Sequence, residues 1–131
     1  MILKGRKVVG GTAEGEALVS AESISFYGGV DPDTGMVVEP GHPLCGQSIT
    51  GKVLVFPTGK GSTVGSYVIY RMWKQGTAPA AIIMRETEAI IATGCVMAGI
   101  PLVDKLDQDP IKAIKNGVST KVDASRGVVS F

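Results

Sequence analysis

The sequence predicts an α/β fold built around a mixed β-sheet. A short, β-branched apolar run at 52–56 is followed by a glycine-rich loop and by a helix-like segment whose apolar residues repeat at four-residue spacing. A second apolar run at 80–84 follows, and two such runs joined by a helix form a right-handed βαβ unit. Strand-forming segments stand before and after this unit, which is typical of a layered domain.

The N-terminal third is expected to contribute strands and turns. Residues 3–9 and 16–20 predict two strands, joined as a hairpin by the glycine-rich turn at 10–15. Residues 23–27 alternate polar and apolar side chains, which predicts a third short strand. The stretch 30–35 pairs a proline with a glycine, as turns do.

A rigid, proline-rich loop at 39–47 is suited to border a binding site. It contains His42, the only histidine of the chain. Pro43 beside it and the absence of a neighbouring ligand pattern favour a plain loop residue over a catalytic or metal-binding one.

The C-terminal half is expected to alternate helices and strands. Residues 88–98 predict a helix, and residues 99–103 predict a strand with its proline near the start. Asp109 and Pro110 fit the N-cap and the first position of a further short helix. The last two expected strands, joined by a turn, are 119–122 and 127–131.

The glycine-rich loop at 57–66 is the candidate site. It follows the central strand at the end where open α/β sheets bind ligands, and the N–H groups of the next helical turn point toward it. Its glycines allow close backbone approach, Lys60 adds a positive charge, and Ser62 can cap the helix or present its hydroxyl to a substrate. The loop therefore predicts an anion site, with an ordinary helix cap as the alternative.

Two common motifs are excluded. A nucleotide P-loop needs four residues between its first glycine and a Gly-Lys-Ser/Thr ending, and this loop lacks that spacing. The Gly-x-Ser-x-Gly nucleophile elbow is broken because Val64 stands between Thr63 and Gly65.

Composition narrows the function classes. The length of 131 residues predicts one domain over 1–131, and a net charge of +1 without a long basic run argues against nucleic-acid binding. No apolar run approaches the roughly eighteen residues that span a bilayer, and no signal-peptide core opens the sequence, so a cytoplasmic location is expected. Cys45 and Cys95 are too few to form a zinc or iron–sulfur site, so such a cofactor has to come from another chain.

Four pieces of the sequence form a recognisable set. They are Gly29-Val30-Asp31-Pro32-x-Thr34-Gly35, Gly41-His42-Pro43-Leu44-x-Gly46, Gly51-Lys52-Val53-Leu54-Val55-Phe56-Pro57-x-Gly59-x-Gly61-Ser62-x-x-Gly65-Ser66 and Ile90-Ile91-Ala92-x-Gly94-x-Val96-x-Ala98-Gly99-Ile100-Pro101. Together they resemble the small subunit of the aconitase X family over essentially the full chain. The resemblance implies a swivelling β/β/α domain, like the mobile fourth domain of aconitase, bound to a larger catalytic subunit.

The resemblance also implies a hydro-lyase that dehydrates a small hydroxy acid. The large subunit is expected to carry an iron–sulfur cluster, and the family's proton-accepting serine falls on Ser62. The expected substrate contacts are Gly59, Lys60, Gly61 and Thr63, and no metal ligand is expected on this chain. A free-standing small subunit implies (R)-5-phosphomevalonate as substrate and trans-anhydromevalonate 5-phosphate as product, in the mevalonate pathway. Bacterial relatives, often fused chains, instead dehydrate cis-3-hydroxy-L-proline.

This chemistry requires the loop to favour an ionised serine. Dehydration removes the proton next to the carboxylate while the hydroxyl leaves, so Ser62 would act as an alkoxide base. A helix terminus supplies at most about 2 kcal/mol, or roughly one and a half pKa units, which does not ionise a serine. Lys60, the loop N–H groups, the cluster and the exclusion of water must supply the rest. Arg71 is expected to be a solvated surface charge.

Two other classes of function stay open at this level. Some swivelling domains carry a phosphohistidine, but the corresponding stretch here holds Thr93, Gly94 and Cys95 in place of a histidine. A noncatalytic regulatory module predicts that replacing Ser62 costs the ~1 kcal/mol of a lost cap and leaves turnover unchanged.

Overall fold

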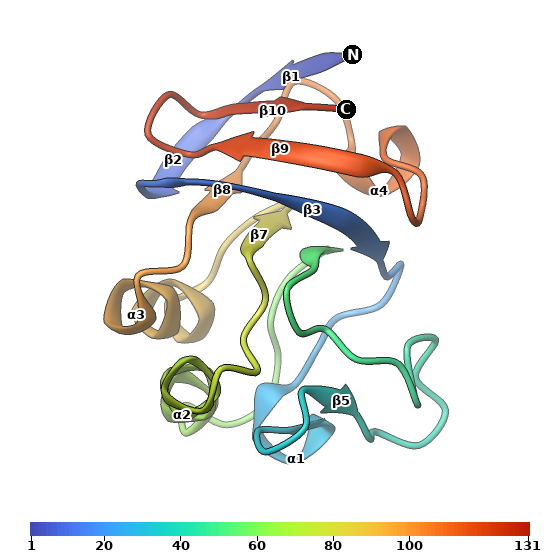
Figure 1. Cartoon of the computed structure of the whole chain (residues 1–131), viewed down its shortest axis with the longest axis vertical. Helices are drawn as coiled ribbons and strands as arrows, with labels where there is room; N and C mark the ends of the chain where they lie inside the picture. Colours follow the sequence, from blue (N-terminus) through green and yellow to red (C-terminus); the bar gives the residue numbers. More distant parts are fainter.

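The computed structural model describes residues 1–131, which form two β-layers and one layer of helices (Figure 1). One eight-stranded sheet has the order β1-β10-β9-β3-β6-β7-β8-β2, and β4 and β5 form a separate pair. The strands are β1 (Ile2–Lys4), β2 (Arg6–Val9), β3 (Thr12–Val19), β4 (Val30–Asp31), β5 (Met36–Val37), β6 (Val53–Phe56), β7 (Ala81–Met84), β8 (Leu102–Asp104), β9 (Ser119–Asp123) and β10 (Val128–Ser130). The helices are α1 (Phe26–Gly29), α2 (Gly65–Gln75), α3 (Ala89–Ala98) and α4 (Pro110–Ala113).

The large sheet folds back on itself into the two β-layers. β1 pairs antiparallel with β10, whereas β2, which follows it directly, pairs antiparallel with β8 at the opposite edge. The chain changes layers at Gly5, whose N–H donates to the Gly127 carbonyl at 2.8 Å. A Cβ at Gly5 would collide with the Asp104 carbonyl, so only glycine fits this crossing. β3 also serves both layers, because it pairs antiparallel with β9 and parallel with β6.

The expected N-terminal hairpin is wrong. β2 and β3 are consecutive, but each pairs with a strand from the C-terminal half and not with the other. Residues 12–15, assigned to the glycine-rich turn, begin β3 and pair with β9. Tertiary pairing overrides weak local strand propensity here.

The third short strand expected at 23–27 is also wrong. Ile24 forms one isolated parallel bridge with Gly59, and the chain then turns into the irregular single turn of α1. Phe26 at the start of α1 is buried, and its ring lies 6.3 Å from the ring of Phe56. Burial of this aromatic side chain against the central strand therefore decides the local conformation.

The predicted βαβ unit is confirmed. β6, β7 and β8 are parallel neighbours, and α2 and α3 provide the crossovers between them. Side chains of β6 alternate between two cores: Val53 and Val55 lie between the β-layers, while Leu54 and Phe56 pack against the helices. This double burial explains why the strand reads as a continuous apolar run.

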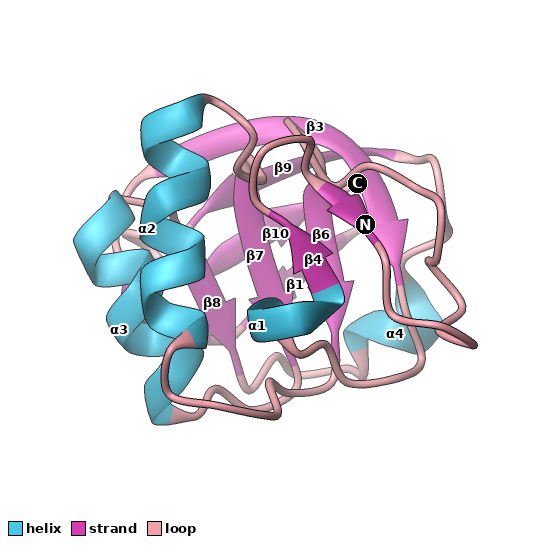
Figure 2. Ribbon diagram, turned by 90° about the horizontal axis from the view of Figure 1, so that it is seen from below, coloured by secondary structure: helices cyan, strands magenta, loops and turns pink.

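Helices α2 and α3 lie side by side on one face of the sheet (Figure 2). The ends of both helices are set by capping residues. Helix α2 ends at Gly76, which has a left-handed φ of 77°, and Glu88 caps α3 by accepting hydrogen bonds from the N–H groups of Ile90 and Ile91. They approach closely at Gly94, where a Cβ would lie 2.8 Å from Cδ1 of Ile69. Close packing of α2 on α3 thus depends on this glycine.

Asp104 joins β8 to two other parts of the fold through its buried carboxylate. Arg6 of β2 donates to both carboxylate oxygens, at 2.9 and 2.7 Å, and the Thr87 N–H donates to Oδ2 at 2.8 Å. Burial alone raises the pKa of this carboxyl, but the hydrogen bonds from Arg6 and Thr87 outweigh burial and hold the pKa below its ordinary value of 3.8.

We expect the protein to lose stability in acid through Asp104. Because its folded-state pKa is depressed, the stabilising contribution is complete above the unfolded-state pKa and is lost as pH falls through the folded-state pKa. One such carboxyl changes the free energy of unfolding by at most about 1.4 kcal/mol per pH unit. Urea unfolding from about pH 6 down to about pH 3 should give a shallower decline for Asp104→Asn than for the wild type. Equal slopes would contradict this assignment.

Candidate functional site

The glycine-rich loop leaves the carboxyl end of β6 and is held against the segment before α1. The Lys60 N–H donates to the Ile24 carbonyl at 3.1 Å. Gly61 has a φ of 89°, and a Cβ there would collide with the hydroxyl of Ser25. Gly59 has no room for a Cβ either, because the carboxylate of Glu88 lies against it. The loop therefore has a defined path that two of its glycines make possible.

Ser62 is exposed at the tip of this loop, two residues before the N-cap position of α2, which is Val64. Its Oγ accepts a hydrogen bond from the Val64 N–H at 3.1 Å. No side chain caps α2, so the alternative interpretation of Ser62 as an ordinary helix cap is wrong. An N–H bond to a hydroxyl oxygen favours the ionised form of that hydroxyl, which is the form that can accept a proton.

The donors available to an anion differ from those expected. The N–H groups of Gly65 and Ser66, in the first turn of α2, already donate to the carbonyls of Ser62 and Thr63 at 2.9 and 3.2 Å. In contrast, the N–H groups of Gly61, Ser62 and Thr63 donate to no atom of the chain. The free donors thus come from the loop itself, at Ser62 and at its two neighbours in the chain.

Lys60, an expected substrate contact, pairs with Glu39 at an Nζ to Oε2 distance of 3.1 Å. Both side chains are partly exposed, so this ion pair is weak and an anion can compete for the lysine. Sequence reasoning missed Glu39 itself, although it opens the proline-rich loop that was expected to border a site. The pair places that loop directly beside the glycine-rich loop.

His42 and Arg71 have structural roles. His42 is buried, and its Nδ1 accepts the Leu44 N–H at 3.0 Å, so the proton is on Nε2 and is donated to the Ser23 carbonyl at 3.1 Å. These bonds tie the proline-rich loop to the segment before α1. Arg71 pairs with Asp33 at 2.8 Å, with both side chains more than half exposed, which fits the expected surface charge.

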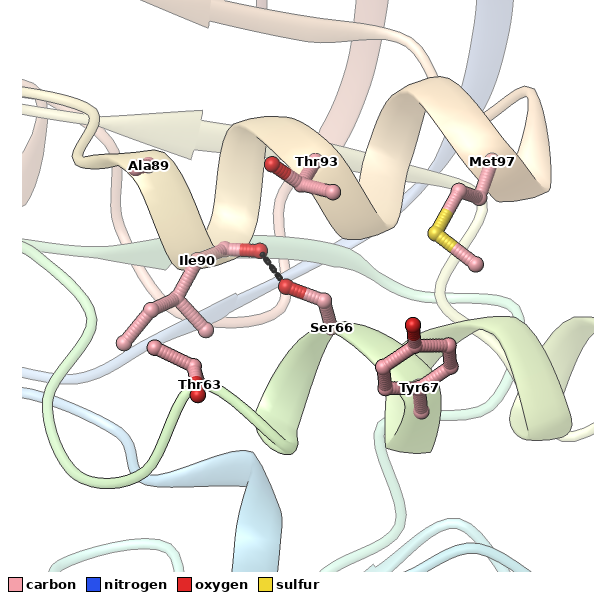
Figure 3. A pocket seen from close by; sticks show the side chains of 7 residues that line it. All are labelled: Thr63, Ser66, Tyr67, Ala89, Ile90, Thr93 and Met97. Carbon is pink, nitrogen blue, oxygen red and sulfur yellow. Dashed lines mark hydrogen bonds between the residues drawn. The ribbon is translucent and has the colours of Figure 1, made fainter.

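A groove of about 240 Å³ separates α2 from α3 next to the loop (Figure 3). Its lining consists of Thr63, Ser66, Tyr67, Ala89, Ile90, Thr93 and Met97. The Ser66 hydroxyl donates to the Ile90 carbonyl at 2.7 Å, so it closes the floor of the groove and is not free for a ligand (Figure 3). Ser62 itself does not line this groove.

The residues of this chain do not fit an iron–sulfur cluster. Cys95 lies on the buried side of α3, where burial and the negative charge of Glu88 raise the pKa of its thiol to about 12, and Cys45 is exposed on a loop. No three His, Cys, Asp or Glu side chains are grouped as metal ligands would be. None of the helices combines the length and the apolar character needed to cross a membrane.

Comparison with known proteins gives consistent results along the whole chain. Residues 2–131 match the family model described as the aconitase X swivel domain. The "Phosphomevalonate dehydratase small subunit" of Methanocella arvoryzae is 54% identical over 131 residues, covering 100% of this chain and 99% of the relative. The protein of the same name from Thermococcus onnurineus is 57% identical over 129 residues, covering 98% and 97%.

A solved structure extends the similarity to three dimensions. The crystal structure of Thermococcus kodakaraensis aconitase X in its holo-form superposes with a TM-score of 0.94 at 54% identity, covering 99% of this chain and 97% of that one. The family and the β/β/α fold expected from the four sequence pieces are therefore confirmed. The chain belongs to the aconitase X swivel-domain family.

Proposed function

We propose that this chain, as one swivelling domain over residues 1–131, is the small subunit of a cytoplasmic hydro-lyase that dehydrates (R)-5-phosphomevalonate to trans-anhydromevalonate 5-phosphate. The substrate assignment rests on the full-length identity of 54% and 57% with proteins named phosphomevalonate dehydratase small subunit. The geometry of the glycine-rich loop supports the reaction type, because the exposed Ser62 hydroxyl lies on a stretch of backbone with free N–H donors.

In this proposal Ser62 is the proton acceptor. The C–H bond next to the substrate carboxylate breaks, and its proton moves to the Ser62 oxygen. The electron pair forms the carbon–carbon double bond while the C–O bond to the hydroxyl breaks. The departing hydroxide takes up the proton that Ser62 accepted, so water is released and the serine returns to its ionised form. The Val64 N–H bond to Oγ and the positive charge of Lys60 favour the ionised serine before the proton arrives.

The remaining loop residues would hold the substrate. The free N–H groups of Gly61 and Thr63 can donate to a carboxylate or phosphate oxygen, and Gly59 lets the loop pass close to Glu88 and Ile91, which sets the path of this backbone. Lys60 would exchange Glu39 for a substrate anion. The iron–sulfur cluster implied by the family would belong to the large subunit, where it would supply a Lewis-acidic iron to assist departure of the hydroxyl.

Reconstitution with the large subunit tests the substrate. The two proteins are mixed anaerobically, and consumption of (R)-5-phosphomevalonate and of cis-3-hydroxy-L-proline is followed in parallel by mass spectrometry. We expect turnover of the phosphorylated acid only. Turnover of the hydroxyproline alone would instead assign the chain to the other branch, and the relatives at more than half identity do not favour that branch.

A further inference from the structure

Helix α3 carries no charged side chain at any point of its circumference, and Thr93 is its only hydroxyl-bearing residue, although one side of the helix faces solvent. No charged residue occurs from Ala89 to Val103 or from Gly61 to Tyr70, which includes all of α3 and the first half of α2. A helix without a polar face is normally covered on every side. Here the sheet and α2 cover only the inner side, where Ile91 and Cys95 are buried.

The uncovered side forms one surface, which we call the α2/α3 face and define by Val64, Tyr67, Thr93, Val96 and Met97. All five are exposed, and Val96 and Tyr67 retain 65% and 64% of their accessible surface. Thr93, Tyr67 and Met97 also line the groove between the two helices (Figure 3). An exposed apolar surface around a groove is typical of a protein interaction site.

We propose that the α2/α3 face docks on an uncharged, apolar surface of the large subunit, and that the groove receives an apolar side chain from it. This inference rests on the proposed function, in which Ser62 reaches the partner's active site. Thr63 follows Ser62 directly and lines the groove, so a partner that surrounds Ser62 is continuous with one that covers this face. A charged partner surface would lose its hydration here without gaining an ion pair.

A single charge placed on the α2/α3 face tests the proposal. In Val96→Lys the new ammonium group would be desolvated at the contact, and we expect the Kd for the large subunit to rise by about tenfold or more. Ile2→Lys is the matched control, because Ile2 is 61% exposed and lies on β1, in the β-layer remote from α2 and α3 (Figure 1). Its Kd should equal that of the wild type. Sedimentation velocity of the two-chain mixture gives both constants.

Three further measurements separate loss of docking from loss of stability and from self-association. Thermal unfolding of the isolated Val96→Lys chain should match that of the control, and Thr93→Arg provides a second exposed position if it does not. A photo-crosslinking residue at position 96 should attach to the large subunit, and one at position 2 should not. Sedimentation of the small subunit alone tests a second copy as the occupant. The proposal would be overturned if Val96→Lys and Thr93→Arg both bound the large subunit with wild-type affinity. It would also be overturned if the small subunit associated with itself and only these two variants abolished that association.

Failure of the proposed function has a different signature. If the wild-type complex forms but turns over neither substrate, the catalytic assignment fails while the affinities of Val96→Lys and Ile2→Lys still test the surface. Conversely, if the complex turns over substrate and also tolerates a charge at positions 93 and 96, the docking proposal is wrong and the proposed reaction still holds.

Discussion

Ser62→Ala should lower turnover of (R)-5-phosphomevalonate by about 10²- to 10⁴-fold in the reconstituted complex, which is the usual contribution of a positioned proton-transfer group. The methyl group that replaces the hydroxyl cannot accept the substrate proton, and the hydroxyl of Ser66 cannot take its place, because it is committed to the Ile90 carbonyl. Initial rates at saturating substrate report the loss. The affinity for the large subunit should stay unchanged.

The control is Ser119→Ala, which removes a hydroxyl from an exposed serine at the start of β9. Its turnover should equal that of the wild type. A regulatory role for the loop predicts a different pattern, in which Ser62→Ala changes stability by about 1 kcal/mol or less and leaves turnover intact. That pattern would remove Ser62 from the reaction and leave it as a turn residue before α2.

Phe56→Ala should destabilise the protein by about 3–5 kcal/mol, a large share of the stability of a small domain. The ring is fully buried at the end of β6, packs among the residues between the sheet and the helices, and lies beside the ring of Phe26. Its loss leaves a cavity directly before the glycine-rich loop. The midpoint of urea unfolding, with its slope unchanged, measures the effect.

Phe56→Leu provides the comparison, because it keeps an apolar side chain that fills part of the space. Its cost should be clearly smaller than that of the alanine variant. Two equal costs, or a midpoint for Phe56→Ala within error of the wild type, would mean that the packing around Phe56 does not hold this region together.

Local patterns predicted the elements that depend on nearby residues. The βαβ unit follows from two apolar runs and a four-residue repeat, and the helix limits follow from Gly76, Glu88 and Pro110. The position of the candidate loop follows from the same logic, since a loop after a parallel strand lies at the ligand-binding edge of the sheet. All of these signals act over a few residues, so they do not depend on how the rest of the chain folds.

The errors occurred where distant segments decide the outcome. Residues 12–15 look like a turn, yet they become a strand because β9, more than a hundred residues later, offers its hydrogen bonds. In the same way, the free donors around Ser62 were expected in the helix and are found in the loop. The carbonyls of Ser62 and Thr63 accept the first N–H groups of the helix, and no pattern of residue types in the sequence predicts these hydrogen bonds.

The sequence by itself therefore determined the family resemblance, the central strand, loop and helix, and the candidate serine. Only the tertiary structure decided that one N-terminal segment serves both β-layers, that Glu39 holds Lys60, and that α3 presents an uncharged face to solvent. The physical reason is the range of the interactions. Periodicity and turn chemistry are local, whereas strand pairing, ion pairs and surface exposure depend on segments that meet only once the chain has folded.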